Sequence, residues 1–181
     1  MTKQVLFIQG GGGEEDYAAD AKLVASLREN LGDGYAVHYP RLPTGPEPDF
    51  GRQAQIEKAV SSLPSNLVLV GHSLGASMLL KYLSETPGPK RVAGVFLLAT
   101  PFWSGPEDWK QGFILHPDFA GKLPQNLPVY FYHCEDDEVV PFTQLGLYAQ
   151  RLPQAIIRPI PHGGHQFNDD AALVARDIKA L

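Results

Sequence analysis

Short apolar segments recur along the chain, and their spacing restricts its fold more than any other feature. Three of them, in the middle of the chain, are almost continuously apolar, which is typical of strands buried on both faces of a parallel sheet. Strands and helix-like segments alternate over the whole length. This alternation predicts a doubly wound α/β fold, with a mostly parallel sheet of about six strands between two layers of helices. The expected strands are VLFI (5–8), YAVHY (35–39), NLVLVG (66–71), VAGVFLLAT (92–100), PVYFYHC (128–134) and AIIRPI (155–160).

The segments between these strands carry apolar residues at helical spacing. They end at breakers such as the Gly-Asp-Gly of residues 32–34 and Pro64. Pro159 lies inside the last apolar segment. Because proline has no backbone N–H to donate, that segment is expected at the edge of the sheet. The expected helices span residues 16–31, 50–63, 74–85, 141–152 and 168–181.

Size and composition fit one globular domain over residues 1–181, of which 44% are hydrophobic and 19% charged. The net charge is −5 and the acidic residues are scattered, so nucleic acid is not an expected partner. No apolar run is long enough for a signal-peptide core or a membrane span. The single cysteine, Cys134, fits a reducing compartment and a small core residue. A cytoplasmic protein without a membrane partner is therefore expected.

Residues 101–127 interrupt the regular pattern. This segment contains both tryptophans, three phenylalanines and four prolines, and it has no clean period. Its length of about 27 residues is unusual for a connection in a compact domain, where long insertions are often lids or binding loops. We therefore expect a lid or insertion here.

A run of four glycines, Gly10–Gly13, follows the first expected strand and raises the question of which anion it approaches. A dinucleotide-binding loop needs a third glycine where Glu15 stands, and a phosphate loop needs Gly-Lys-Ser/Thr before the helix. Residues 14–16 are instead all acidic, which suits the helix dipole but repels a bound phosphate. A permanent phosphate site is disfavoured, although four glycines exceed what one tight turn requires.

The stretch Gly71-His72-Ser73-Leu74-Gly75 fits the GxSxG pattern of a nucleophile elbow, between an expected buried strand and an expected helix. In such a turn, the glycines two residues before and after the serine leave room for crowded backbone. The pattern predicts that Ser73 is a nucleophile and that the Leu74 N–H faces a developing oxyanion. The alternative is a purely structural turn.

A serine nucleophile needs a base and an acid, and hydrolases of this architecture place them in the order Ser, Asp/Glu, His. Asp136 and Asp137 follow the fifth expected strand, while His162 and His165 follow the sixth. Because the carboxyl ends of parallel strands meet at one edge of a sheet, the candidate groups are expected on the same rim. This order is the strongest indication of a catalytic triad in the sequence.

The GHSLG, DEVVP and GGHQF motifs give the chain a resemblance to the α/β-hydrolase superfamily over essentially its full length. Among its members, the chain resembles the small serine hydrolases of the retinoblastoma-binding-protein-9 and YdeN type. The resemblance implies an α/β-hydrolase fold with Ser73 as the nucleophile. It selects Asp137 as the acid, which precedes x-x-V-P in the family, and His165 as the base, which follows glycine. Asp136 is then a turn or capping residue, and His162 shapes its loop.

The resemblance also assigns a role to the glycine run. In this superfamily the loop after the first strand supplies the second oxyanion N–H, often from an HG-x sequence, which here reads Gln9-Gly10-Gly11. Gly11 is the expected donor beside Leu74, with Gln9 in place of the usual histidine. The anion is then a transient tetrahedral oxyanion, and the reaction requires no metal or organic cofactor.

Two further groups of residues have alternative interpretations. His162 and His165, with Asp169 nearby, form a possible metal site, but the two histidines lie on a glycine loop and Asp169 is not an established third ligand, so no metal is expected. Phe102 and Trp103 follow a strand end and are expected to line an acyl or leaving-group pocket. Alternatively, the aromatic residues of the insertion only pack it onto the sheet.

The sequence thus predicts an esterase-like serine hydrolase that acts on a small-molecule ester, thioester or amide. One alternative is a protein-interaction module that keeps the fold and the triad but has little turnover. Another is a different reaction on the same scaffold, such as perhydrolysis or a lyase step, because fold alone does not decide function. No pattern in the sequence indicates an oligomeric state.

Overall fold

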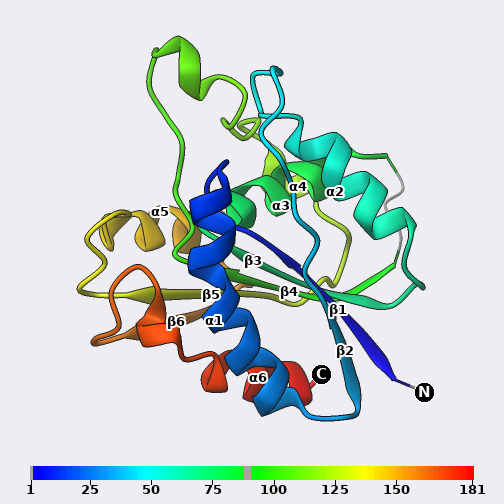
Figure 1. Cartoon of the computed structure of the whole chain (residues 1–181). Helices are drawn as coiled ribbons and strands as arrows, with labels where there is room; N and C mark the ends of the chain where they lie inside the picture. The colour runs from blue at the N-terminus through cyan, green and yellow to red at the C-terminus, as the bar shows by residue number, and fades with distance from the viewer. Residues whose placement is uncertain (1, 88–90) are drawn as a thin grey trace.

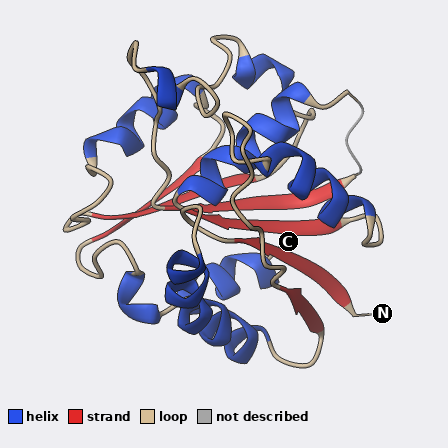
Figure 2. Cartoon of the chain, turned by 45° about the horizontal axis from the view of Figure 1, so that its top comes forward, coloured by secondary structure: helices blue, strands red, loops and turns tan. Residues whose placement is uncertain are grey.

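Strands that all run in one direction form the middle layer of the protein (Figure 2). The computed structural model describes residues 2–87 and 91–181, and within them the sheet has the order β2-β1-β3-β4-β5-β6 with parallel neighbours throughout. Each expected strand is present, which confirms the predicted α/β class. The strands are β1 Lys3–Ile8, β2 Tyr35–His38, β3 Leu67–His72, β4 Val92–Leu98, β5 Val129–Cys134 and β6 Ile156–Ile160.

The apolar content of each strand matches its place in the sheet. Every residue of β3 is buried, as expected for a strand between two neighbours and two helical layers. At the edge, β6 has no buried residue and carries Pro159 opposite His133 of β5. The prediction that Pro159 marks an edge strand is confirmed.

Helices cover both faces of the sheet (Figure 1). On one face, α1 (Glu14–Leu31) and α6 (Ala172–Lys179) pack on each other and on the sheet. The opposite face is covered by α2 (Arg52–Ser61), α3 (Leu74–Glu85), α4 (Phe119–Lys122) and α5 (Thr143–Arg151). The result is the expected three-layer sandwich. Among the helices of the described residues, none has the length and apolarity that a membrane crossing requires.

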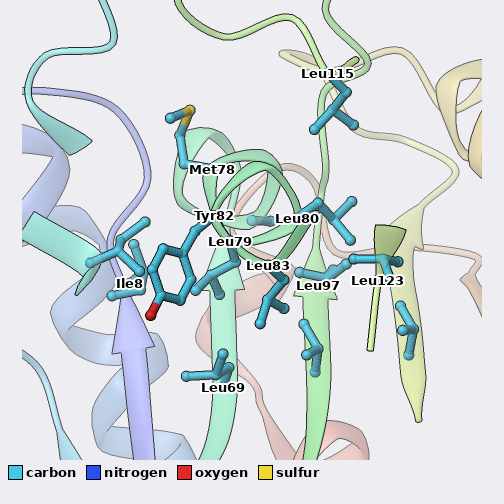
Figure 3. Packing of buried hydrophobic residues seen from close by; sticks show 14 of the residues in the cluster. Ile8, Leu69, Met78, Leu79, Leu80, Tyr82, Leu83, Leu97, Leu115 and Leu123 are labelled. Carbon is cyan, nitrogen blue, oxygen red and sulfur yellow. The ribbon is translucent and has the colours of Figure 1, made fainter. Parts of the chain in front are cut away.

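Helix α3 is the most deeply buried of these helices. Met78, Leu79 and Leu80 are fully buried, and Figure 3 shows side chains of this helix above Leu69 of β3 and Leu97 of β4. A helix that is apolar on nearly all sides is stable only where neighbouring elements bury it on those sides. The first residue of this helix, Leu74, therefore has a fixed position at the end of β3.

The 101–127 segment has two parts. Phe113, Phe119 and Leu123 are buried in the core beside α3, so the second part packs onto the sheet layer. The first part contains the short helix η1 (Asp108–Lys110), where Trp109 is 61% exposed. In Figure 1 this part is the green arch that rises above the body of the molecule.

The start of the last helix differs from the sequence prediction. Helix α6 begins at Ala172 and not at residue 168. Residues Phe167–Asp169 instead form the short helix η2, with φ values of 56°, 50° and 57°. These left-handed conformations end the loop that carries His165, and an α-helix of L-residues cannot include them.

Truncation of Leu79 tests the importance of α3 for stability. Leu79→Ala removes a fully buried side chain, and we expect a loss of about 2–5 kcal/mol in the free energy of unfolding measured with urea. Leu147→Ala is the matched control, because Leu147 is 36% exposed on α5. Equal losses for the two variants would contradict the assignment of α3 as the centre of the core.

Candidate active site

A sharp turn at Ser73 joins β3 to α3. Ser73 has φ 50° and ψ −122°, a strained conformation for a residue other than glycine, and its N–H donates to the Leu98 carbonyl at 2.8 Å. A Cβ atom at Gly71 would lie 2.8 Å from the Ala76 nitrogen. At Gly75, a Cβ would lie 2.3 Å from the Gln9 carbonyl oxygen. The glycines of the GxSxG pattern are therefore required by backbone crowding.

An acid and a histidine meet beyond the ends of β5 and β6. The His165 Nδ1 lies 3.0 Å from Asp137 Oδ2 and 3.1 Å from Oδ1. The Asp137 side chain is fully buried, while that of His165 is 10% exposed. Both loops leave the same edge of the sheet as the Ser73 turn, because β3, β5 and β6 are parallel.

Several donors stabilise the Asp137 carboxylate. The Val139 and Val140 N–H groups donate to Oδ1 at 2.9 and 2.8 Å, and His133 Nε2 lies 3.2 Å from Oδ2. Burial alone would raise the pKa of Asp137, but hydrogen bonds from His133, His165 and these two amides lower the pKa well below its usual range. An ionised Asp137 accepts a hydrogen bond, so this contact favours the His165 tautomer with the proton on Nδ1.

The neighbours of Asp137 hold the backbone of the histidine loop. Asp136 accepts hydrogen bonds from the Gly163 and Gly164 N–H groups at 3.0 and 2.9 Å. Glu138 accepts one from the His165 N–H at 3.0 Å. Asp136 thus caps the loop, and the structure brings Asp137 to the imidazole ring.

His162 lies on the outside of this loop. Its side chain is 86% exposed, and its Nδ1 is 3.6 Å from Asp136. Asp169, the other ligand of the imagined metal site, is instead 3.8 Å from Lys22. Within the described residues, no group of three His, Cys, Asp or Glu side chains has an arrangement that could hold a metal ion.

The glycine run lies against the Ser73 turn. Gly11 has φ 53°, and a Cβ atom on the neighbouring Gly10 would lie only 3.1 Å from the Ser73 Cβ. The N–H groups of Gly11 and Leu74 donate to no other group of the described residues. Both residues line the same pocket as Ser73. Two free N–H groups beside a nucleophile candidate are what an oxyanion hole requires.

Buried polar side chains support the glycine run from behind. The fully buried Arg52 donates to the Gly11 carbonyl at 3.0 Å and to the Leu42 carbonyl at 2.7 Å. The Gln9 side chain accepts the Leu42 N–H at 3.0 Å. Gln9, which departs from the superfamily pattern, therefore joins the glycine run to the neighbouring loop.

A pocket of about 430 Å³ opens beside Ser73. Phe102 and Trp103, which the sequence predicts as pocket residues, both line it. The Trp103 Nε1 donates to the Ser77 hydroxyl at 2.9 Å, and the Phe102 N–H donates to the Gln144 side chain at 2.7 Å. Phe119, in contrast, packs in the core. The aromatic residues of the pocket wall are Phe50, Phe102, Trp103, Trp109 and Phe113.

Besides Arg52, sequence reasoning missed a buried pair behind the site. His72, left without a role by the sequence, and Asp20 of α1 are each only 1% exposed, and their side chains are 2.8 Å apart. A signal for Asp20 was present, because it occupies the same helical stripe as the buried Leu23, Val24 and Leu27. An acid in an apolar stripe needs a buried partner.

Cys134 is a core residue at the end of β5. It is fully buried, and burial, with the nearby charges of Asp136, Asp137 and Glu138, raises the pKa of its thiol to about 12. The thiol is therefore protonated near neutral pH and is not an alternative nucleophile.

Similarity to known proteins shows the family of this chain. A model of the family described as serine hydrolase matches residues 50–175, more than half of the chain. The chain belongs to the serine hydrolase family. It is also 27% identical over 179 residues to YdeN of Bacillus subtilis (strain 168), an alignment that covers 94% of this chain and 89% of YdeN.

Solved structures support the fold of this serine hydrolase. The crystal structure of the Bacillus subtilis ydeN gene product matches with a TM-score of 0.68 and 22% identity, over 99% of this chain and 98% of that one. SOBER1 of Arabidopsis thaliana matches with a TM-score of 0.71 and 15% identity, over 99% of both chains. An esterase domain of a Rhodothermus marinus protein matches with a TM-score of 0.67 and 19% identity, over 98% of this chain and 84% of that one. The predicted α/β-hydrolase fold and the resemblance to the YdeN type are confirmed.

The lowered pKa of Asp137 predicts how stability depends on pH. Its folded pKa lies below the unfolded value of about 3.9, so its ionisation stabilises the fold above that pH and the effect is lost as the pH falls. We expect the free energy of unfolding in urea to fall between about pH 5 and pH 2, and less steeply in Asp137→Asn. Asp136→Asn, with a 45% exposed side chain, is the control and should keep more of the slope. An unchanged slope in Asp137→Asn would contradict this assignment.

Proposed function

We propose that the protein is an esterase-like acyl hydrolase in which Ser73 is the nucleophile, His165 the base and Asp137 the acid. The observation that carries this proposal is the 3.0 Å contact between His165 and Asp137 on the rim where the strained Ser73 turn ends. Membership of the serine hydrolase family supports the same reaction class.

In this mechanism His165 Nε2 takes the Ser73 hydroxyl proton as the oxygen attacks the acyl carbonyl carbon. Asp137 holds the tautomer with the proton on Nδ1 and stabilises the imidazolium that forms. The imidazolium then gives its proton to the leaving group as the bond to the acyl carbon breaks. Water, activated by His165, attacks the acyl-enzyme and releases the acid, which returns Ser73 to its starting state. The sequence of steps uses protein groups and water alone.

The N–H groups of Gly11 and Leu74 stabilise the tetrahedral oxyanion of each step. Each donor contributes on the order of 3 kcal/mol to transition-state stabilisation. The Arg52 guanidinium holds the Gly11 carbonyl, which fixes the direction of the glycine run, and adds positive charge behind it.

The substrate is a small-molecule ester, thioester or amide with an apolar acyl or leaving group. The aromatic wall of the 430 Å³ pocket supports this class, because Phe50, Phe102, Trp103, Trp109 and Phe113 offer an apolar surface in the pocket that Ser73 lines. The first part of the 101–127 segment supplies Trp103 and Trp109 to the pocket and acts as the lid of a single domain, residues 1–181.

A protein-interaction module with little turnover is the second candidate. Trp109 and Val139 favour it, because both lie at the pocket and are 61% exposed. Apolar side chains exposed together at the rim of a site can bind a partner. A covalent probe for activated serines separates the two candidates.

Labelling with a fluorophosphonate, with the adduct located by peptide mass spectrometry, tests the nucleophile. We expect rapid labelling of Ser73 and turnover of short p-nitrophenyl esters. Both activities should fall by roughly 10⁴-fold or more in Ser73→Ala and His165→Ala, since the triad acts as a unit. His162→Ala is the matched control and should keep full activity. A folded wild-type protein that neither labels nor turns over would favour the interaction module.

The acid assignment is tested in the same assay. Asp137→Asn should lower kcat by roughly 10⁴-fold because Nδ1 loses its carboxylate acceptor. Asp136→Asn should have a much smaller effect. The reverse order of the two variants would overturn the choice of Asp137.

Acyl-chain preference tests the pocket. Trp103→Ala removes a wall beside Ser73, so kcat/KM should fall about 10-fold or more for p-nitrophenyl hexanoate and less for the acetate. Trp109→Ala is the control, because this more exposed ring contributes less buried area. Equal losses for both esters in Trp103→Ala would place the acyl chain elsewhere.

A further inference from the structure

A buried charged pair connects the loops of the candidate site. His72 and Asp20 are each 1% exposed, and His72 Nδ1 lies 2.8 Å from Asp20 Oδ1. The ring nitrogen and the carboxylate oxygen are thus within the distance of an ion pair. The proposed mechanism uses neither side chain.

The contacts of His72 determine its protonation state. Its Nε2 lies 2.9 Å from the His165 backbone carbonyl, which can only accept, so Nε2 carries a proton. Its Nδ1 faces the Asp20 carboxylate, so this nitrogen carries a proton as well. His72 is therefore an imidazolium. The pKa shifts agree with this charge state. Burial opposes the charge of each group, but the attraction between the two partners raises the pKa of His72 and lowers that of Asp20.

Through these contacts, one ion pair reaches the glycine run, the Ser73 turn and the histidine loop. Asp20 Oδ2 accepts the Gly10 N–H at 2.7 Å, next to the proposed oxyanion donor Gly11. His72 directly precedes Ser73 in the elbow. Its Nε2 holds the main chain of His165, whose ring lies 4.7 Å from the His72 ring.

We propose that the Asp20–His72 ion pair is a positioning device that fixes His165 and the glycine run relative to Ser73. Neither residue touches the substrate; both act through the backbone of the residues that do. This inference rests on the proposed function, because the geometry that it fixes is that of the proposed triad and oxyanion hole.

Energetics favour positioning over a contribution to stability. Desolvation of two charges offsets much of their attraction, and apolar replacements of buried ion pairs are often as stable. A small displacement of reacting groups, in contrast, lowers the rate steeply. The pair is therefore expected to matter more for turnover than for folding.

The surroundings of the pair contain few other titratable groups. Asp137 and the His165 ring face His72 from the acid and histidine loops. Tyr39 lies near Asp20, and burial, with the Asp20 charge, raises the pKa of its phenol. The neighbouring Gln166 side chain also lowers the pKa of Asp20. Over the neutral pH range, Asp20 is thus the partner that compensates the His72 charge.

Nitrogen NMR of the wild-type protein with ¹⁵N-labelled histidine tests the charge state directly. Comparison with His72→Gln assigns the His72 signals among the six histidines. We expect both ring nitrogens of His72 to keep the shifts of protonated nitrogens at about pH 8, which is above the usual histidine pKa of about 6.5. A neutral ring with one unprotonated nitrogen would overturn the proposal. If His72→Gln does not fold, coupling to the adjacent residues assigns the signals.

Kinetics of Asp20→Asn test positioning. We expect kcat to fall about 10- to 100-fold with KM little changed, since the triad and the oxyanion donors are displaced but the pocket is intact. Asp177→Asn is the matched control: Asp177 is also a nearly buried acid, bound to Tyr132 and Arg158 away from the site. It should lower stability and leave kcat unchanged.

An unchanged kcat in Asp20→Asn, or an equal loss in Asp177→Asn, would show that the pair has only a structural role. Failure of the proposed function is recognised separately, because wild-type protein would then not label at Ser73. The NMR result does not depend on that outcome.

Discussion

Backbone crowding at the Ser73 turn determines how the rest of the site is built. Helix α3 begins so close to the end of β1 that a Cβ at Gly75 would overlap the Gln9 carbonyl. The same closeness brings Gly10 against the Ser73 side chain. Because the chain reverses from β3 into a deeply buried helix, the turn has no freedom to relax. A strained Ser73 conformation is held in place by the core, which is how such strain persists at functional sites.

The histidine loop has little regular structure and depends on carboxylates for its shape. Asp136 and Glu138 bind its backbone N–H groups, while Asp137 binds the His165 ring. Consecutive carboxylates on one loop repel each other, and the amide donors of both loops offset this repulsion. The His72 imidazolium adds a donor from the opposite side, at the His165 carbonyl. His165 is thus held through both its main chain and its ring.

Local patterns predicted the elements well and the long-range contacts poorly. The strands and the GxSxG turn follow from apolar runs and from glycine spacing, which are local properties. The predicted start of α6 was wrong because Phe167–Asp169 adopt left-handed conformations, which the spacing of apolar residues does not reveal. Asp20 and Arg52 were missed for another reason. Their partners lie far along the chain, at residues that only the folded sheet brings next to them.

The glycine run shows how fixed charges can favour a transient anion over a resident one. A phosphate site uses several N–H groups of a loop together. Here Asp16 already accepts the N–H groups of Gly12 and Gly13, and Asp20 accepts that of Gly10. Among the described residues, the Gly11 N–H is the one donor of the run without an acceptor, and Gly11 lines the same pocket as Leu74 and Ser73. A single N–H from each of two loops suits one developing oxygen charge, and the surrounding carboxylates disfavour a bound phosphate dianion.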